Sequence, residues 1–356
     1  MKRRAWLLAA LPLQALADVR RSRTLAFPRD HGVHPETRTE WWYATGWLGP
    51  DDAPRLGFQL TFFRSRTGLA EGSASRFAAR QLLFAHAAVT DLGTKRHLHA
   101  QRIARWSGDV SVPLAHATHA ANSDTDVRLA DWTLRRDGNV YAARLPAADF
   151  ALDLTLQTTQ PLLLQGDAGF SRKGPEEHHA SHYYSQPQLV VGGSVTLGSQ
   201  RLALPGRAWL DHEWSDEYLA PEAVGWDWIG INLFDGGALT AFRLRRADGS
   251  ALWAGGSHRA AGAASRSFAA TEVQFTASRT WASPASQARY PVQWQVDTPA
   301  GRFEVRALMD TQELDSRGST GAIYWEGIAE VLDAQGRRIG LGYLEMTGYA
   351  SRLQMR

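Results

Sequence analysis

The sequence predicts an all-β protein with two domains, each a barrel or sandwich of antiparallel strands. Stretches of alternating apolar and polar residues are frequent, whereas the periodicity of amphipathic helices is scarce. Turns that contain glycine or aspartate separate these stretches at short intervals, which is typical of barrels and sandwiches. The length of 356 residues exceeds that of one typical domain and favours two.

The first half of the chain predicts seven strands. They are expected at residues 42–48, 57–64, 81–90, 132–136, 140–145, 150–157 and 189–197. Asp137-Gly138 predicts a tight hairpin turn between two of them. The polar segment 158–188 is rich in Gly, Pro and His and is interpreted as a long functional loop.

The second half repeats this style. Strands are expected at residues 225–234, 237–246, 271–277, 292–297, 301–308, 322–333 and 338–349. A Trp-rich strand, a turn and an apolar strand ending in Arg occur at 40–64 and again at 225–243, which favours two similar domains, although two generic hairpins could share the pattern. We expect the boundary near 205–222 and assign the domains to 18–210 and 211–356.

The N-terminus predicts a signal peptide over residues 1–17. Lys2, Arg3 and Arg4 form a basic start, an apolar stretch follows, and Ala15-Leu16-Ala17 is a cleavage site. A short amphipathic helix is the alternative. We expect an exported, periplasmic or secreted protein that uses the Sec route rather than Tat, because only the arginine pair fits a twin-arginine signal.

Charge and composition exclude several classes of partner and site. The formal net charge is +3, and the signal peptide carries three basic and no acidic residues, so the remainder has no net charge. Nucleic-acid binding, which needs a basic face, is therefore not expected. There is no Cys, hence no disulfide, thiolate metal site or lipid anchor on Cys. No later stretch approaches about 20 apolar residues, so an integral membrane protein is not expected either.

The familiar catalytic motifs G-x-S-x-G, H-E-x-x-H, the P-loop and G-x-G-x-x-G are missing. The sequence feature that indicates a functional site is instead a set of clusters in which acidic and His residues lie among aromatic residues. Asp211, His212 and Glu213 lie in a row beside Trp214, where they should shift one another's pKa values unless they form a surface turn. On a strand, Asp211 and Glu213 share one face, while His212 and Trp214 share the other.

Three further clusters have the same character. Glu40 precedes Trp42 on a predicted strand and is either a pocket residue or a buried acid paired with Arg38. The second is Trp226-Asp227-Trp228, and the third places Glu345 among aromatic residues. The segment from His178 to Tyr184 holds three His residues, but their spacing favours a pocket-lining loop. No metal and no cofactor are expected.

Four segments in order resemble one family. FPRDHGVHPETRTEWWYATGWL, AWLDHEWS, GWDWIGINL and YWEG with GYLEMTGY are similar to the AttH-like, carotenoid-1,2-hydratase-like proteins, often labelled predicted secreted hydrolases. The resemblance extends from about residue 27 to 350. It implies two lipocalin-like (calycin-like) β-barrels with a pocket near their junction. It also implies relatives that act as hydratases or cyclases on terpenoid and polyketide-like molecules, and others encoded beside ABC-transporter permeases.

The resemblance suggests roles for the clustered residues. Asp211 or Glu213 would be the proton donor, since a carboxylic acid in an apolar pocket keeps its proton near neutral pH. His212 would orient water, and aromatic faces would stabilise a cation. The expected binding residues are Glu40, Trp42, Tyr184, Trp214, Trp226, Asp227, Trp228 and Glu345. We expect Glu40, Asp211, His212, Glu213 and Trp228 to converge on one cavity.

Two functions follow. The first is an exported enzyme that hydrates or hydrolyses a hydrophobic, terpenoid- or lipid-like molecule. The second is a periplasmic carrier of such a ligand or an accessory factor of an ABC-type transporter. Hydratase members place a Tyr-x-Asp pair on the strand after Gly-Trp-Asp, whereas Thr240 and Phe242 stand there in this chain. This departure weakens the expectation of true carotenoid hydration.

Overall fold

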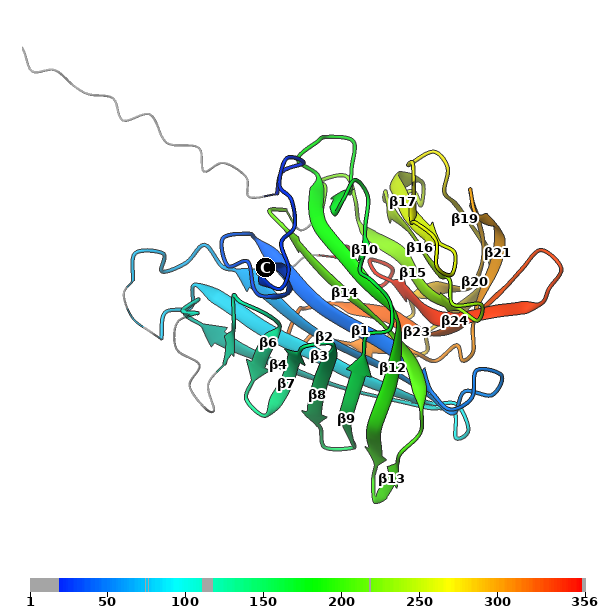
Figure 1. Ribbon diagram of the computed structural model, residues 1–356, viewed down its shortest axis with the longest axis horizontal. Helices are drawn as coiled ribbons and strands as arrows, with labels where there is room; N and C mark the ends of the chain where they lie inside the picture. Colours follow the sequence, from blue (N-terminus) through cyan, green and yellow to red (C-terminus); the bar gives the residue numbers. More distant parts are fainter. Residues whose placement is uncertain (1–18, 74, 76, 111–117, 218, 354–356) are drawn as a thin grey trace, which may run out of the picture.

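The computed structural model describes residues 19–73, 75, 77–110, 118–217 and 219–353 (Figure 1). The prediction of an all-β fold is confirmed, because the described residues form 24 strands in two antiparallel sheets, one of them a nearly closed barrel. Their one helical element is the short 3₁₀ turn η1 (Arg29–His31). No helix among the described residues has the length and apolar character needed to cross a bilayer. The predicted signal peptide lies outside the described residues.

The first sheet has fourteen strands. They are β1 (Thr39–Leu48), β2 (Leu56–Arg66), β3 (Gln81–Asp91), β4 (Arg96–Trp106), β5 (His119–Ala120), β6 (Asp126–Leu129), β7 (Trp132–Asp137), β8 (Val140–Pro146), β9 (Phe150–Gln157), β10 (Leu163–Leu164), β11 (Phe170–Arg172), β12 (Ala180–Leu197), β13 (Gln200–Leu202) and β14 (Gly206–Ser215). Their order is β4-β3-β2-β1-β14-β12-β9-β8-β7-β6-β5, and β10, β11 and β13 pair with β12. The last long strand, β14, therefore lies between β1 and β12.

The second sheet has ten strands. They are β15 (Gly225–Leu233), β16 (Ala238–Arg245), β17 (Ala251–Arg259), β18 (Arg266–Phe268), β19 (Gln274–Ala282), β20 (Arg289–Thr298), β21 (Gly301–Ala307), β22 (Glu313–Asp315), β23 (Ile323–Leu332) and β24 (Arg338–Met346). Their order is β18-β17-β16-β15-β24-β23-β21-β20-β19, with β22 beside β23. The Trp-rich strands β1 and β15 occupy equivalent positions, since each lies between its hairpin partner and the last long strand of its sheet.

Each sheet curves around its own apolar core. The first core includes Trp42, Phe62 and Trp132, and the second includes Ile229, Trp294 and Trp325. A third cluster joins the sheets, and it contains Tyr43, Trp47, Trp209, Trp228, Ile328 and Tyr343. Each large apolar side chain that is fully buried contributes about 1.5–3 kcal/mol. The packing between the sheets therefore fixes the geometry of their junction.

Two expected irregular regions are strands. Residues 180–188 belong to β12, not to a loop. Hydrogen bonds make the burial of polar side chains possible here: Ser181 donates to Glu213, and Ser185 donates to Asp211. The stretch 206–215, which we expected to lie at a boundary, is the central strand β14. The chain passes from the first sheet to the second between Ser215 and Gly225. The division into 18–210 and 211–356 stays a prediction.

Candidate active site

A cavity of about 130 Å³ lies between the two sheets. The first sheet lines it with Trp41, Tyr43, Phe63, Tyr183, Asp211 and Glu213. The second sheet lines it with Trp226, Trp228, Phe242, Tyr324, Glu326 and Glu345. Aromatic rings from both sheets therefore line the cavity, with carboxyl groups set among them.

Strand pleating decides which side chains of the first sheet reach the cavity. Successive side chains point to opposite faces of a strand, so only alternate residues can do so. The register of β1 with β14 pairs Trp41 with Glu213 and Tyr43 with Asp211. On the other side of β14, Tyr183 of β12 lies opposite Glu213. Three adjacent strands thereby present acidic and aromatic groups on one face.

The second wall is a cross-strand row of four residues. Phe242 on β16 lies opposite Trp228 on β15, which lies opposite Glu345 on β24, which lies opposite Glu326 on β23. All four line the cavity. Direct cross-strand partners have their Cβ atoms about 4.5–5.5 Å apart. Two carboxyl groups are therefore immediate neighbours.

Asp211 is the most extensively hydrogen-bonded acid of the cavity. Its carboxylate accepts hydrogen bonds from Trp209 Nε1 at 2.6 Å, Ser185 Oγ at 2.6 Å and Tyr183 Oη at 2.8 Å. Trp228 Nε1 in turn donates to Tyr183 Oη at 3.2 Å. Burial raises the pKa of Asp211 to about 7, although the three hydrogen bonds oppose the shift. Such a group can give or take a proton near neutral pH.

Glu326 and Glu345 are the strongest candidates for neutral acids. Burial raises the pKa of Glu345 to about 8, and the charges of Asp211 and Glu213 act in the same direction. Burial, together with the charge of Glu345, raises the pKa of Glu326 well above its ordinary value. Glu326 and the Tyr43 hydroxyl are buried neighbours, but among the described residues neither Oε1 of Glu326 nor that hydroxyl makes a hydrogen bond of good geometry. These atoms could contact a bound molecule.

Lys173 brings a positive charge to the cavity wall. Its Nζ lies 3.0 Å from Glu213 Oε1, to which Ser181 Oγ also donates at 2.5 Å. The same Nζ lies 4.2 Å from the ring centre of Phe242 and 4.6 Å from that of Tyr183. Glu213 is therefore an ion-paired acid, in contrast to the Glu326 and Glu345 pair.

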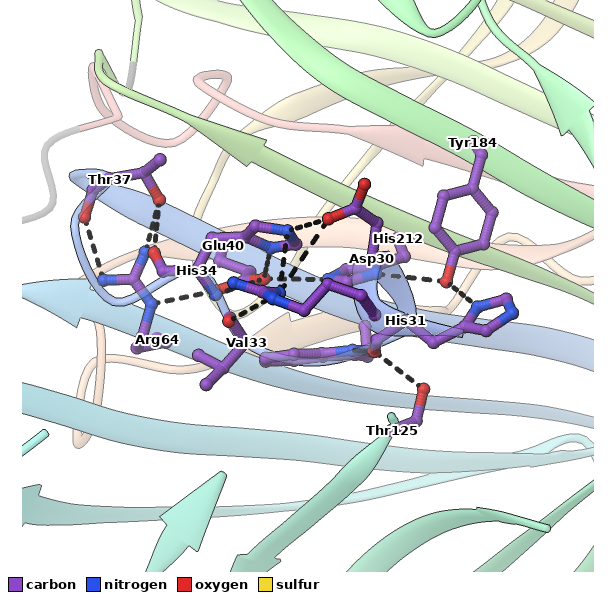
Figure 2. Close-up of polar contacts among 12 residues, drawn as sticks. Asp30, His31, Val33, His34, Thr37, Glu40, Arg64, Thr125, Tyr184 and His212 are labelled. Carbon is purple, nitrogen blue, oxygen red and sulfur yellow. Dashed lines mark hydrogen bonds and ion pairs between the residues drawn. The ribbon is translucent and has the colours of Figure 1, made fainter. Parts of the chain in front are cut away.

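A second cluster of ionisable groups is buried on the opposite face of β1 and β14 (Figure 2). Oε1 of Glu40 lies 2.8 Å from His34 Nδ1 and 2.9 Å from His212 Nε2, and Arg64 Nε donates to Oε2 at 3.0 Å. His212 Nδ1 lies 3.1 Å from the hydroxyl of Tyr184. Burial alone would raise the pKa of Glu40, but His34, His212 and Arg64 bring it below its ordinary range. Burial lowers the pKa of His212.

The expectation of a single cavity for the predicted residues is wrong. Asp211, Glu213 and Trp228 line the cavity, whereas Glu40 and His212 contact each other behind its wall. The cause is the alternation of side chains along β14, which sends His212 to the face opposite Asp211 and Glu213.

Three predicted binding residues lie with His212 behind the wall. The ring of Trp42 stacks on His212 with centroids 4.7 Å apart, and Trp214 stacks on His34 at 3.8 Å. Tyr184 contacts His212 through its hydroxyl. None of the three lines the cavity, because each is on the side of its strand that faces the buried cluster.

The remaining predicted residues lie on the second sheet, where some line the cavity and one points to the opposite face. Trp226 and Glu345 line the cavity. Asp227 points to the other side of β15, where Arg243 Nε lies 2.7 Å and Arg245 Nε 3.0 Å from its Oδ2. Asp227 is therefore a buried ion-pair residue rather than part of the cavity.

Sequence reasoning missed much of the cavity wall, including Tyr183, Glu326 and Lys173. Tyr183 lies in a segment that we interpreted as a loop. Its spacing of two residues from Ser181 and from Ser185 is the signal that could have put it on a strand, on the same face as these two residues. Glu326 lies between apolar and aromatic residues of a predicted strand, as Glu345 does. Lys173 lies between β11 and β12, and no pattern in the sequence indicates its role.

Comparisons with known proteins agree over nearly the whole chain. A family model described as AttH-like matches residues 18–349. A solved AttH protein from Nitrosomonas europaea is 45% identical, with a TM-score of 0.84, and the match covers 94% of this chain and 100% of that chain. None of the curated proteins compared matches the sequence.

Two more distant structures share the fold. Kievitone hydratase from Nectria haematococca is 14% identical with a TM-score of 0.69, and the match covers 92% of this chain and 94% of that one. CghA is 12% identical with a TM-score of 0.54, and the match covers 91% and 95% of the two chains. These likenesses confirm the lipocalin-like architecture that the sequence led us to expect.

Proposed function

Because this chain belongs to the AttH-like family, we propose that it is a hydratase-like or cyclase-like enzyme that encloses an apolar small molecule. One observation carries the proposal: three carboxyl groups with raised pKa values, Asp211, Glu326 and Glu345, face one aromatic cavity. Kievitone hydratase has the same fold, which supports hydration chemistry without identifying the substrate.

The first step that we propose is protonation of a carbon–carbon double bond. Glu345 transfers its proton to one carbon, the π electron pair forms the new C–H bond, and the other carbon becomes cationic. The faces of Trp226 and Trp228 stabilise this cation, because the electron-rich face of an indole attracts positive charge. The raised pKa of Glu345 keeps its proton available at neutral pH.

The second step decides between hydration and cyclisation. In hydration, water bonds to the cationic carbon and loses a proton to a base. In cyclisation, a second double bond of the substrate attacks the cation, and a proton is lost from carbon to the same base. Asp211 is suited to this role, since Tyr183, Ser185 and Trp209 fix the position of its carboxylate. His212, to which we first assigned the orientation of water, lies behind the wall and takes no part in this scheme.

A panel of polyene and prenylated small molecules, incubated with the protein in water labelled with heavy oxygen (¹⁸O), tests the proposal. Hydration incorporates the label into the product, and cyclisation gives an isomer of unchanged mass. Glu345→Gln should reduce turnover by about 10²–10⁴-fold, the usual contribution of a general acid. Glu330→Gln is the matched control, because Glu330 lies on β23 but pairs with Arg306. Retention of parental turnover by Glu345→Gln would exclude this acid.

A carrier of a lipid-like ligand is the second candidate. Phe242 favours this candidate. It is an apolar residue of the cavity wall, whereas the resemblance to hydratases leads us to expect the Asp of a Tyr-x-Asp pair at this position. A carrier would retain a ligand and release it unchanged, which mass spectrometry of protein purified from the periplasm would detect. Export to the periplasm or medium, and action beside an ABC-transporter permease, are parts of the proposal that rest on the sequence.

A further inference from the structure

We propose a divalent transition-metal site, best matched to Zn²⁺, formed by His178, His179 and Glu217 at the wall of the cavity. The three residues each offer one ligand atom, and these atoms lie within 4.8 Å of one another. His179 and Glu217 also line the cavity. The inference does not depend on the proposed function, because it concerns metal binding by other residues of this wall.

The fold explains why residues so far apart in sequence meet here. In the register of β12 with β14, Ser181 lies opposite Ser215. Because the strands are antiparallel, the residue two positions before Ser181 and the residue two positions after Ser215 are neighbours. These residues are His179 and Glu217. The turn that precedes β12 adds His178, whose ring centroid lies 4.3 Å from that of His179.

The distances suit ligands around a common ion better than direct hydrogen bonds. Oε2 of Glu217 lies 3.5 Å from His179 Nε2, and Oε1 lies 3.7 Å from His178 Nε2. Hydrogen bonds between such groups are about 2.7–3.2 Å long. Ligands about 2.0–2.1 Å from a tetrahedral Zn²⁺ are separated by roughly 3.3 Å. Small side-chain rotations would therefore complete three coordination bonds.

The state of His179 is the second observation that points to a ligand. Its side chain is only 7% exposed, yet among the described residues its Nδ1 has no hydrogen-bond partner, and its Nε2 lies 3.5 Å from Oε2 of Glu217. A buried polar group without a partner carries a free-energy cost. No hydrogen bond to Nδ1 fixes the ring of His179, so the ring can turn to present a nitrogen to an ion between it and Glu217. His178 and Glu217 are more exposed, at 59% and 44%, so an ion can reach them from solvent.

The other His–carboxylate cluster provides the contrast. Around Glu40, the nitrogens of His34 and His212 lie at direct hydrogen-bonding distances of 2.8 and 2.9 Å. Arg64 is paired with the same carboxylate and would oppose a cation. That cluster is a completed hydrogen-bond network, whereas the His178, His179 and Glu217 cluster leaves space and donor atoms for an ion.

Two imidazoles and one carboxylate are a ligand set that Zn²⁺ prefers, and three protein ligands leave a coordination position open. Because His179 and Glu217 line the cavity, that position would face it. A bound zinc ion can polarise an oxygen atom or lower the pKa of a bound water molecule. The site would therefore suit a ligand with an oxygen function at this end of its apolar body.

Zinc titration of the untagged full chain tests the proposal. After removal of metal with a chelator, calorimetry should show one Zn²⁺ bound per molecule, and Co²⁺ should give the visible absorption of a tetrahedral site. His179→Ala and Glu217→Gln should each weaken Zn²⁺ binding by at least about 10–100-fold, the loss that follows removal of even an outer-shell partner. His178→Ala should weaken it as well.

Two matched controls exclude general effects. Glu177→Gln removes a neighbouring carboxylate that pairs with Arg21, and His258→Ala removes an imidazole of the second sheet. Both should bind Zn²⁺ as the parent does, and thermal unfolding of every variant should remain cooperative. Absence of Zn²⁺ binding by the parent would overturn the proposal. Equal affinity in the parent, His179→Ala and Glu217→Gln would also overturn it.

Discussion

Glu326 and Glu345 lie directly opposite each other on β23 and β24, and both carboxyl groups face the cavity between the sheets. Two carboxylates this close repel each other in an apolar site, so the pair retains a proton at a pH at which isolated acids are ionised. The proposed chemistry depends on this retention, because a neutral carboxylic acid is the proton donor.

The first prediction concerns the pH dependence of stability. The ordinary pKa of Glu345 is 4.5 and its folded value is about 8, so the folded state binds more protons than the unfolded state between these values. The free energy of unfolding should therefore fall as pH rises through this window, by about 1.4 kcal/mol per pH unit for each retained proton. Glu345→Gln should reduce the slope in urea titrations at several pH values. Glu222→Gln, at an exposed position, should leave the slope unchanged. An unchanged slope in Glu345→Gln would show that Glu345 does not retain its proton in this pH window.

The second prediction concerns the buried partner of Arg64. Glu40→Gln removes the carboxylate that faces the fully buried Arg64 guanidinium. A buried charge without its partner costs about 3–5 kcal/mol, so the free energy of unfolding should fall by that amount. Glu36→Gln, at an exposed position nearby, should change it by no more than about 0.5 kcal/mol. Equal stability of the two variants in chemical denaturation would show that the Glu40–Arg64 pair is dispensable.

The third prediction separates stability from turnover at His212. His212→Ala removes a ring that packs on Trp42 and contacts both Glu40 and Tyr184. We expect a loss of roughly 2–4 kcal/mol in the free energy of unfolding. Turnover per folded molecule should stay within about tenfold of the parent, since the ring is not in the cavity wall, whereas removal of a general acid or base costs more. Abolished turnover at full stability would instead assign His212 to the chemistry.

The fourth prediction concerns export. When the full chain is produced in a bacterium with a periplasm, the exported protein should begin at Asp18, because Ala15-Leu16-Ala17 is the predicted cleavage site. Mass spectrometry of the N-terminal peptide from the periplasmic fraction measures this directly. Ala17→Arg should block cleavage and leave the precursor uncut. Periplasmic protein that begins at Met1 would refute the signal peptide.

The sequence could predict which side chains share a face of a strand, because side chains alternate between the two faces. It correctly separated Asp211 and Glu213 from His212 and Trp214, and the structure has these pairs on opposite faces of β14. The all-β fold followed from the same periodicity, because each half-buried strand carries it locally. The error was to combine both faces into one cavity.

The features of the site that the sequence could not predict depend on pairing between distant segments of the chain. Glu326 and Glu345 become neighbours only through the register of β23 with β24. The cavity-facing half of β12 looked like a loop because its Ser and Tyr side chains are polar. Their partners, Asp211 and Glu213, lie on another strand, so only the assembled sheet shows why these residues can be buried.

The proposed chemistry requires that Glu345 keep its proton at neutral pH, and this protonation state can be measured. Isotope-edited infrared difference spectroscopy, with label in glutamate carboxyl groups, resolves protonated from ionised side chains. If Glu345 is the proton donor, a protonated carboxyl band is present at neutral pH, titrates near pH 8 and weakens in Glu345→Gln. A spectrum at neutral pH in which every labelled carboxyl group is ionised would contradict this role of Glu345.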